Sequence, residues 1–180
     1  SDGSALTGRV AYMGQQDLLL PWLSVIDNVL LGDRLRSSPD AIRLGNAYEL
    51  LDRVGLRAYA AELPAKLSGG MRQRAALVRT LMEDKPVVVM DEPFSALDAI
   101  TRLKLQDMAA DLLTGRTVFL VTHDPLEALR LGGHIFLMRG RPARLEHICE
   151  HSGATPRDAT DKLVLDQQAK ILNRMRAEGA

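Results

Sequence analysis

A short apolar run at residues 86–90, rich in valine and ending in two carboxylates, most limits how this chain can fold. Its length and β-branched content are typical of a buried parallel strand. Residues 117–121 form a second run of this kind, and residues 98–113 between the two runs have helical periodicity. Strands that alternate with helices predict an α/β fold with a mainly parallel sheet.

The remaining elements follow from local signals. We expect a strand at 8–13, a loop at 14–22, and a helix that begins after Ser24, where Asp27 completes a capping box. Ser38 and Pro39 predict the start of a helix that ends near Gly55, with a broad apolar face made by Ile42, Leu44, Ala47, Tyr48, Leu51 and Val54. Further elements are a mostly buried helix at 69–82, a helix starting at Asp124 and Pro125, a third strand at 134–138 turning at 139–142 into a hairpin, and a helix at 162–176.

Composition excludes several classes of protein. The chain has 180 residues, 46% of them hydrophobic, with 23 basic and 23 acidic side chains, so no global charge favours nucleic acid. Its longest apolar stretch, residues 18–31, contains Pro21 and Asp27 and is too short for a membrane helix. The single Cys149 excludes an internal disulfide. No signal-peptide pattern opens the sequence, so we expect a cytoplasmic, globular protein.

The segment Leu-Ser-Gly-Gly-Met-Arg-Gln-Arg at residues 67–74 carries the first chemical signal. A serine and two glycines at the start of a helix expose backbone N–H groups that can meet an anion such as a phosphate. Taken alone, the same segment is also a common helix cap.

Asp91 and Glu92 carry the second signal, because they stand at the carboxyl end of the expected strand. An acidic residue there can hold Mg²⁺, while its neighbour orients and deprotonates an attacking water. Two adjacent carboxylates alone are more often a solvated turn, but a hydrophobic strand that ends in Asp-Glu-Pro is harder to explain in that way.

These segments occur in the order and spacing of one family, and the chain resembles the ATP-binding subunit of an ABC transporter. Residues 67–74 resemble the signature motif, 87–92 the Walker B motif with its catalytic glutamate, and 95–98 the D-loop. His123 resembles the switch histidine, and residues 12–17 with Pro21 and Trp22 resemble the Q-loop, with Gln15 as its glutamine. The resemblance implies a partial P-loop NTPase (RecA-like) core with a mainly parallel sheet and an α-helical ABC subdomain.

The resemblance also implies cofactors and residue roles. ATP and Mg²⁺ are the expected cofactors, with Asp91 and Gln15 at the metal and Glu92, His123 and Gln15 in catalysis. Nucleotide contacts fall to Ser68, Gly69, Gly70, Gln73 and Asp98, with Ser68 and Gly70 meeting the terminal phosphate of a nucleotide held by a second subunit. Taken singly, each of these three residues is better explained structurally, Gln15 as a surface loop residue, Asp98 as a helix cap and His123 as a strand-end histidine.

The chain departs from the family at the phosphate-binding loop. Gly-x-x-x-x-Gly-Lys-Ser/Thr is absent, and its nearest approach at residues 3–10 has Arg9 and Val10 in place of the lysine and the hydroxyl. A strand-like run follows Gly8 where a helix belongs, so the match is accidental. We therefore expect a chain that lacks the N-terminal Walker A region, and weak or no ATP binding by these 180 residues alone.

The resemblance divides the chain into residues 1–23 (end of the N-terminal core segment and Q-loop), 24–83 (helical subdomain with the signature motif), 84–154 (core with Walker B, D-loop and switch histidine) and 155–180 (linker and helix). The short interval between Gln15 and Ser68 favours a transporter over DNA-repair ATPases, whose insertions there are large. Residues 18–29 resemble importers of the nitrate, sulfonate, taurine and pyrimidine-precursor group.

The expected function is therefore that of an ABC importer subunit, a hydrolase that couples ATP hydrolysis to uptake of a small solute. Its implied partners are a second copy of the subunit, transmembrane permease subunits and, indirectly, a periplasmic or extracellular solute-binding protein, with no nucleic acid. The implied location is peripheral, at the cytoplasmic face of the membrane. The alternatives are a non-catalytic module that docks on a membrane partner, against which Glu92 and His123 argue, and a non-transport ABC-class ATPase.

Overall fold

A computed structural model describes residues 6–37 and 39–176, and its internal packing divides the chain into two units, residues 1–121 and 122–180. The boundary between the units falls within the predicted 84–154 segment, and the four-segment division stays a prediction. Ser38, expected as a helix cap, lies outside the described residues, as do residues 3–5 of the accidental glycine match.

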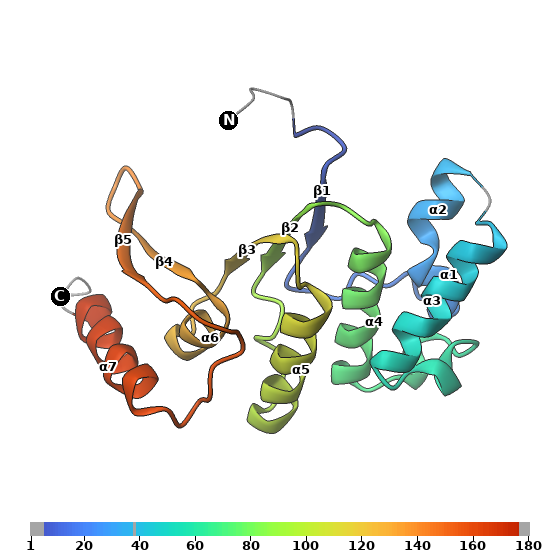
Figure 1. The fold of residues 1–180 in the computed structure, drawn as a ribbon. Coiled ribbons are helices and arrows are strands. Elements are labelled where there is room, and N and C mark those ends of the chain that lie inside the picture. The colour runs from blue at the N-terminus through green and yellow to red at the C-terminus, as the bar shows by residue number, and fades with distance from the viewer. Residues whose placement is uncertain (1–5, 38, 177–180) are drawn as a thin grey trace. The chain divides into compact units, whose positions relative to one another are not determined.

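The first unit contains a parallel sheet of three strands (Figure 1). The strands are β1 (Val10–Met13), β2 (Val87–Asp91) and β3 (Thr117–Val121), with β2 in the middle and parallel to both neighbours. This arrangement confirms the predicted α/β class with a parallel sheet. It also brings the carboxyl ends of β1 and β2, and hence the residues that follow them, to one edge.

The two faces of this sheet differ in burial. On one face Ala11, Met13, Val88 and Met90 are nearly inaccessible, each with 3% or less of its surface exposed. On the other face Tyr12 and Phe119 are each 60% exposed. The expectation that residues 117–121 form a buried strand is therefore wrong: β3 is an edge strand, and along it only Leu120 is even half-buried.

Helix α4 (Gly69–Met82) connects the sheet to the helical part of the unit. It packs against β1 on one side and against α1 (Val25–Val29), α2 (Leu31–Arg36) and α3 (Ala41–Arg53) on the other (Figure 1). Two short 3₁₀ turns, Arg57–Tyr59 and Pro64–Lys66, lead from α3 into α4, and α5 (Ala99–Leu112) follows β2. Eight residues of α4 are buried, as the predicted apolar periodicity requires.

Side-chain caps start most of these helices where the sequence places them. Ser24 accepts a hydrogen bond from the backbone of Asp27, and Ser68 accepts one from Met71. Helix α3 begins later than predicted, because Asp40 is its cap and accepts from the backbone N–H of Arg43 at 2.8 Å.

The apolar face predicted for α3 is wrong in part. Ile42 is 72% exposed and Leu44 is 40% exposed, whereas Ala47, Leu51 and Val54 are fully buried. Only the later turns of the helix therefore contribute fully buried residues, and its first turn lies at the surface.

The second unit contains α6 (Pro125–Leu131), β4 (His134–Arg139), β5 (Arg144–Glu150) and α7 (Lys162–Arg176). Strands β4 and β5 form an antiparallel hairpin, so the third predicted strand is not part of the parallel sheet. The turn between them confirms the hairpin. Leu129, Ile135, Val164 and Ile171 form the core of this unit, where α6 and α7 pack together.

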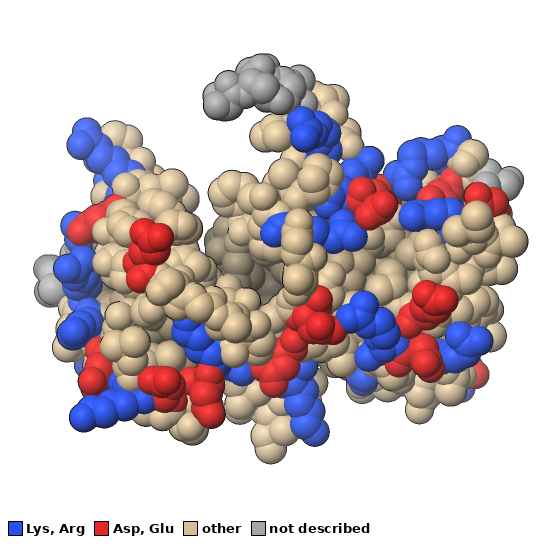
Figure 2. All heavy atoms as spheres, in the orientation of Figure 1, with Lys and Arg blue, Asp and Glu red and all other residues tan. Residues whose placement is uncertain are grey.

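No helix in the described ranges is both long and apolar enough to cross a membrane. Basic and acidic side chains are interspersed over the face of the molecule that Figure 2 shows, without a wide area of one sign.

Candidate active site

The carboxyl ends of β1 and β2 bring together a cluster of polar side chains from two segments, one at the end of each strand. Gln15 donates from Nε2 to Glu92 Oε2 at 3.0 Å and to Ser95 Oγ at 3.5 Å. Tyr12 donates from its hydroxyl to Asp91 Oδ2 at 3.2 Å. The sheet register explains the cluster, because Met13, the last residue of β1, pairs with Met90, the residue before Asp91 at the end of β2.

Glu92 has an unusual backbone conformation, with φ at 45°. This left-handed region is uncommon for a residue other than glycine and costs about 1–3 kcal/mol unless the surroundings hold it. Two neighbours hold it here: the Glu92 N–H donates to the carbonyl of Val121 at 2.8 Å, and the Glu92 carbonyl accepts from the Ser95 hydroxyl at 3.0 Å. These contacts fix the Glu92 backbone, and the hydrogen bond from Gln15 holds its carboxylate.

The donor set at this edge fits a magnesium ion that shares its coordination with phosphate groups. Mg²⁺ in such sites uses one or two carboxylates, substrate phosphates and water. Asp91 offers a carboxylate, and only its Oδ2 accepts the Tyr12 hydroxyl. No group of three or more His, Cys, Asp or Glu side chains in the described ranges could hold a metal ion, so the protein alone does not complete a coordination shell.

Arginines of helix α4 hold the loop that follows Gln15. Arg72 donates from Nε to Asp17 Oδ2 at 3.0 Å, while Arg79 donates to the carbonyls of Asp17 and Leu18 at 2.6 and 2.7 Å. Burial lowers the pKa of Arg79, an effect that the nearby carboxylates of Asp17 and Glu83 oppose. The loop after Gln15 and helix α4 are therefore directly connected.

Asn28 fixes the next part of the same loop. It is completely buried, and its side-chain amide donates to the carbonyls of Leu20, Leu23 and Ser24 and accepts from the Leu20 N–H at 2.7 Å. The turn it holds presents Trp22, which is 71% exposed, whereas Leu19 is only 8% exposed.

The residues predicted to contact nucleotide from the signature motif occupy the start of α4. Ser68 and Gly69 are exposed and Gly70 is half-buried. Gly70 lies so close to α5 that a Cβ there would come within 2.9 Å of Thr101 Cγ2. Gln73 lies deeper: it is 5% exposed, and its amide donates to the carbonyl of Pro93, which ties α4 to the loop after β2.

Asp98 caps α5 and accepts from the backbone N–H of Thr101 at 3.0 Å. Its side chain is exposed, and hydrogen bonds from the Thr101 side chain and backbone hold the pKa of its carboxyl below the ordinary value. His123 belongs to the second unit, where it lies exposed ahead of α6; beside it, Thr122 Oγ1 accepts from the Asp124 N–H at 3.0 Å.

Sequence reasoning placed Gln15, Asp91 and Glu92 at one site but missed four side chains that support it. The hydroxyl of Tyr12, the support from Ser95 and the two arginines of α4 become visible only when β1, β2 and α4 are placed side by side. The alternation of Tyr12 with Ala11 and Met13 could have marked Tyr12 as facing away from the core.

Comparison with known proteins identifies the family. The family model described as ABC transporter matches residues 2–95. An uncharacterized ABC transporter ATP-binding protein of Haemophilus influenzae is 40% identical over 173 residues, which cover 94% of this chain and 72% of the relative. An aliphatic sulfonates import ATP-binding protein of Burkholderia cenocepacia is 41% identical (96% and 64% covered), and a taurine import ATP-binding protein of Pseudomonas aeruginosa is 44% identical (80% and 57% covered).

Solved structures agree with this result. A dimeric ATP-binding cassette in a post-hydrolysis state, bound to ADP and phosphate, superposes with a TM-score of 0.63 at 33% identity, covering 76% of this chain and 62% of that one. An ABC transporter in an inward-facing conformation superposes with a TM-score of 0.67 at 22% identity over 77% of this chain and 58% of that one, a likeness of fold. The chain thus spans between 57% and 72% of the length of the three relatives above. With its motifs, its parallel sheet and these relatives, the chain belongs to the ABC transporter family, among the ATP-binding subunits.

Proposed function

We propose that the chain is the ATP-binding and hydrolysing part of an importer subunit. The hydrogen bond from Gln15 to Glu92 at 3.0 Å carries the proposal, because it joins the loop next to Trp22 to the carboxylate best placed to act as a base. A movement of Glu92 can then alter the position of the loop, and a movement of the loop can displace Glu92. Coupling of hydrolysis to transport requires a connection of this kind.

The roles at the site follow from the chemistry of the groups. Asp91 holds Mg²⁺, directly or through water, and Gln15 contributes its amide oxygen to the metal or to the water. Glu92 orients the attacking water and takes its proton. When bound, the metal neutralises charge on the phosphate oxygens.

The exposed starts of α4 and α5 favour contact with a second subunit. Ser68, Gly69 and Gly70 offer backbone N–H groups to the terminal phosphate of a nucleotide held by that subunit, and Asp98 acts across the same dimer. The buried Gln73 serves this surface by keeping α4 against the loop after β2. The dimeric structure of a related cassette supports this arrangement. His123 holds the terminal phosphate and the attacking water.

The solute that we propose is a sulfonate, in line with relatives named for import of aliphatic sulfonates and taurine. Permease subunits in the membrane carry the solute, and a solute-binding protein outside the membrane delivers it. The ATP-binding subunit then lies at the cytoplasmic face as a peripheral protein.

The substitution Glu92→Gln in the natural full-length subunit tests the proposal. Loss of a general base costs about 10²–10⁴-fold in rate, so steady-state hydrolysis should be almost abolished while Mg-ATP binding, followed by calorimetry, is kept. Glu49→Gln, at an exposed position of α3, makes the same chemical change and should leave hydrolysis unaltered.

Two results would contradict the proposal. Near wild-type hydrolysis by the Glu92→Gln variant would exclude Glu92 as the base. Absence of hydrolysis in the unsubstituted full-length subunit would favour the non-catalytic docking module instead.

A further inference from the structure

A small cavity lies in the second unit, between strand β5 and helix α7. Its volume is about 190 Å³, and it is lined by Ile148, Cys149, Gln167, Lys170, Ile171 and Arg174. Ile171 belongs to the core of the unit and Ile148 packs against that core, so the floor of the cavity is apolar and firmly held. None of the residues assigned to ATP hydrolysis takes part in it.

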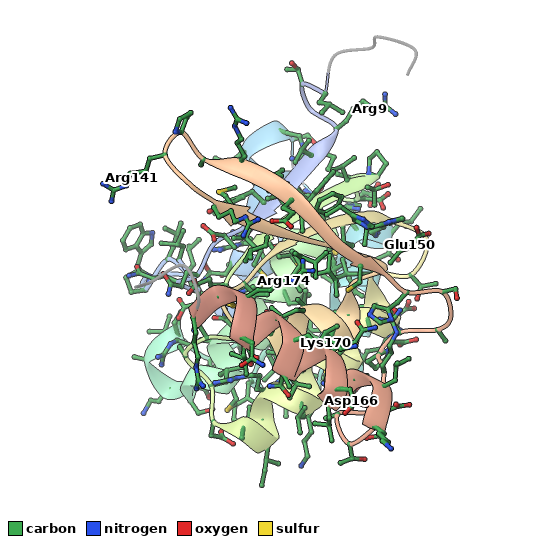
Figure 3. All side chains as sticks on the ribbon, turned by 90° about the vertical axis from the view of Figure 1, so that its left-hand side faces the viewer. Arg9, Arg141, Glu150, Asp166, Lys170 and Arg174 are labelled. Carbon is green, nitrogen blue, oxygen red and sulfur yellow. The ribbon has the colours of Figure 1, made fainter. Side chains whose placement is uncertain are left out.

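The charged groups that line the cavity are both cations. Lys170 and Arg174 stand one turn apart on α7, where they follow Asp166 along the helix (Figure 3). Lys170 makes no hydrogen bond or ion pair with any residue of the described ranges. Arg174 is 3.5 Å from Glu146 Oε1, but Glu146 also pairs with Arg139 and therefore neutralises it only in part.

The Cys149 thiol, which lines the cavity, is influenced by the positive charges around it. Burial raises the pKa of its thiol, and the positive charges of Arg157 and Arg174 act in the opposite direction. Arg157 lies in the linker before α7 and Arg174 lies on α7, so the thiol is influenced by positive charge from two segments. Arg157 is held in place by hydrogen bonds that it donates to the carbonyls of Leu129 and Gly132 at 2.8 Å. An anion in this place would be stabilised from two directions.

Gln167 adds a second feature to the cavity, a hydrogen-bond acceptor that carries no charge. Its Oε1 is buried and accepts no hydrogen bond from the described residues. A buried acceptor without a donor is unfavourable, and a ligand that brings a donor removes that cost. Because the surrounding charges are positive, a neutral hydroxyl suits this position better than an ammonium group.

We propose that this cavity between β5 and α7 is a binding site for a small organic anion, a carboxylate or a sulfonate, that also carries a hydroxyl group. Lys170 and Arg174 bind the anionic group, Gln167 accepts from the hydroxyl, and Ile148 and Ile171 contact the short carbon chain. The cavity volume, about 190 Å³, is below the roughly 300–1,000 Å³ usual for pockets that bind drug-sized ligands, so the ligand has only a few carbons.

Methyl NMR of the full chain, labelled at isoleucine, tests the proposal directly. The probes are 2-hydroxyethanesulfonate and 3-hydroxypropionate, each compared with its analogue without the hydroxyl, ethanesulfonate or propionate, at constant ionic strength. We expect saturable shifts at Ile148 and Ile171 but not at the exposed Ile42 and Ile100. The hydroxylated probe of each pair should bind about fivefold more tightly, and the pair that binds more tightly identifies the anionic group as sulfonate or carboxylate.

Variants on one helix separate this site from general attraction of anions. Lys170→Gln should weaken binding about tenfold by removing a charge-assisted contact. Lys162→Gln, an equal change of charge at the exposed start of α7, should leave the affinity unchanged. Both positions are at the surface, so both variants should fold.

The proposal is overturned by any of three results: no saturable shift up to about 10 mM probe, equal loss of affinity in the two variants, or binding of inorganic sulfate as tight as that of the organic probes. Each readout is independent of ATP hydrolysis, so the outcome does not depend on the proposed function.

Discussion

Replacing Trp22 by alanine should impair assembly with a membrane partner without destabilising the protein. The side chain is 71% exposed, so less than a third of it is buried. A fully buried tryptophan costs about 3–5 kcal/mol when cut to alanine, and the expected loss of folding free energy here is within about 1 kcal/mol. An aromatic anchor at an interface is worth about 2 kcal/mol or more, so the affinity for the partner should fall roughly 30-fold.

Leu19→Ala is the matched variant, three residues away in the same loop. Leu19 is 8% exposed, and its truncation should cost about 2–5 kcal/mol of stability. For a domain of this size 1 kcal/mol corresponds to about 2–4 °C in Tm, which predicts a loss of roughly 4–20 °C for Leu19→Ala and under about 4 °C for Trp22→Ala.

Differential scanning calorimetry of the full-length subunit and co-purification with its permease subunits measure the two effects. Basal ATP hydrolysis by the free subunit should remain nearly intact in Trp22→Ala. The interface would be refuted if the Tm of Trp22→Ala were as low as that of Leu19→Ala, or if Trp22→Ala assembled with wild-type affinity. Trp22 would then only pack within its own subunit.

Three further predictions concern stability. Asn28→Ala should cost at least about 2 kcal/mol in denaturant unfolding, because it leaves buried backbone groups of the 20–24 turn without partners, whereas the exposed Asn46→Ala should be nearly neutral. Gly70→Ala should destabilise by about 1–3 kcal/mol through its contact with Thr101 on α5, while Gly69→Ala, whose Cβ meets only an Arg72 atom 4.0 Å away, should not destabilise. Because the pKa of Asp98 is lowered, its capping interaction stabilises the fold fully at pH values above the ordinary carboxyl pKa of 3.8, and this stabilisation is lost as pH falls through the folded pKa. NMR titration should find the lowered pKa, and Asp98→Asn should remove this part of the dependence of stability on acid pH.

The kinds of element and most of their starts could be predicted from local sequence. The valines of β2 and the hydroxyl and carboxylate caps at Ser24, Ser68 and Asp98 act within a few residues of chain, so their effect can be read locally. The family was readable for a related reason, because its motifs are short segments in a set order.

Tertiary structure alone decided which side chains meet and which remain exposed. Whether a leucine is buried depends on what packs over it, which is why Leu19 and Trp22 differ within one loop and why the edge strand β3 is exposed although its sequence is apolar. The hydrogen bonds from Gln15 to Glu92 and from Tyr12 to Asp91 join residues almost 80 positions apart. Only the register of β1 on β2 brings them together, and that register depends on contacts over the whole sheet.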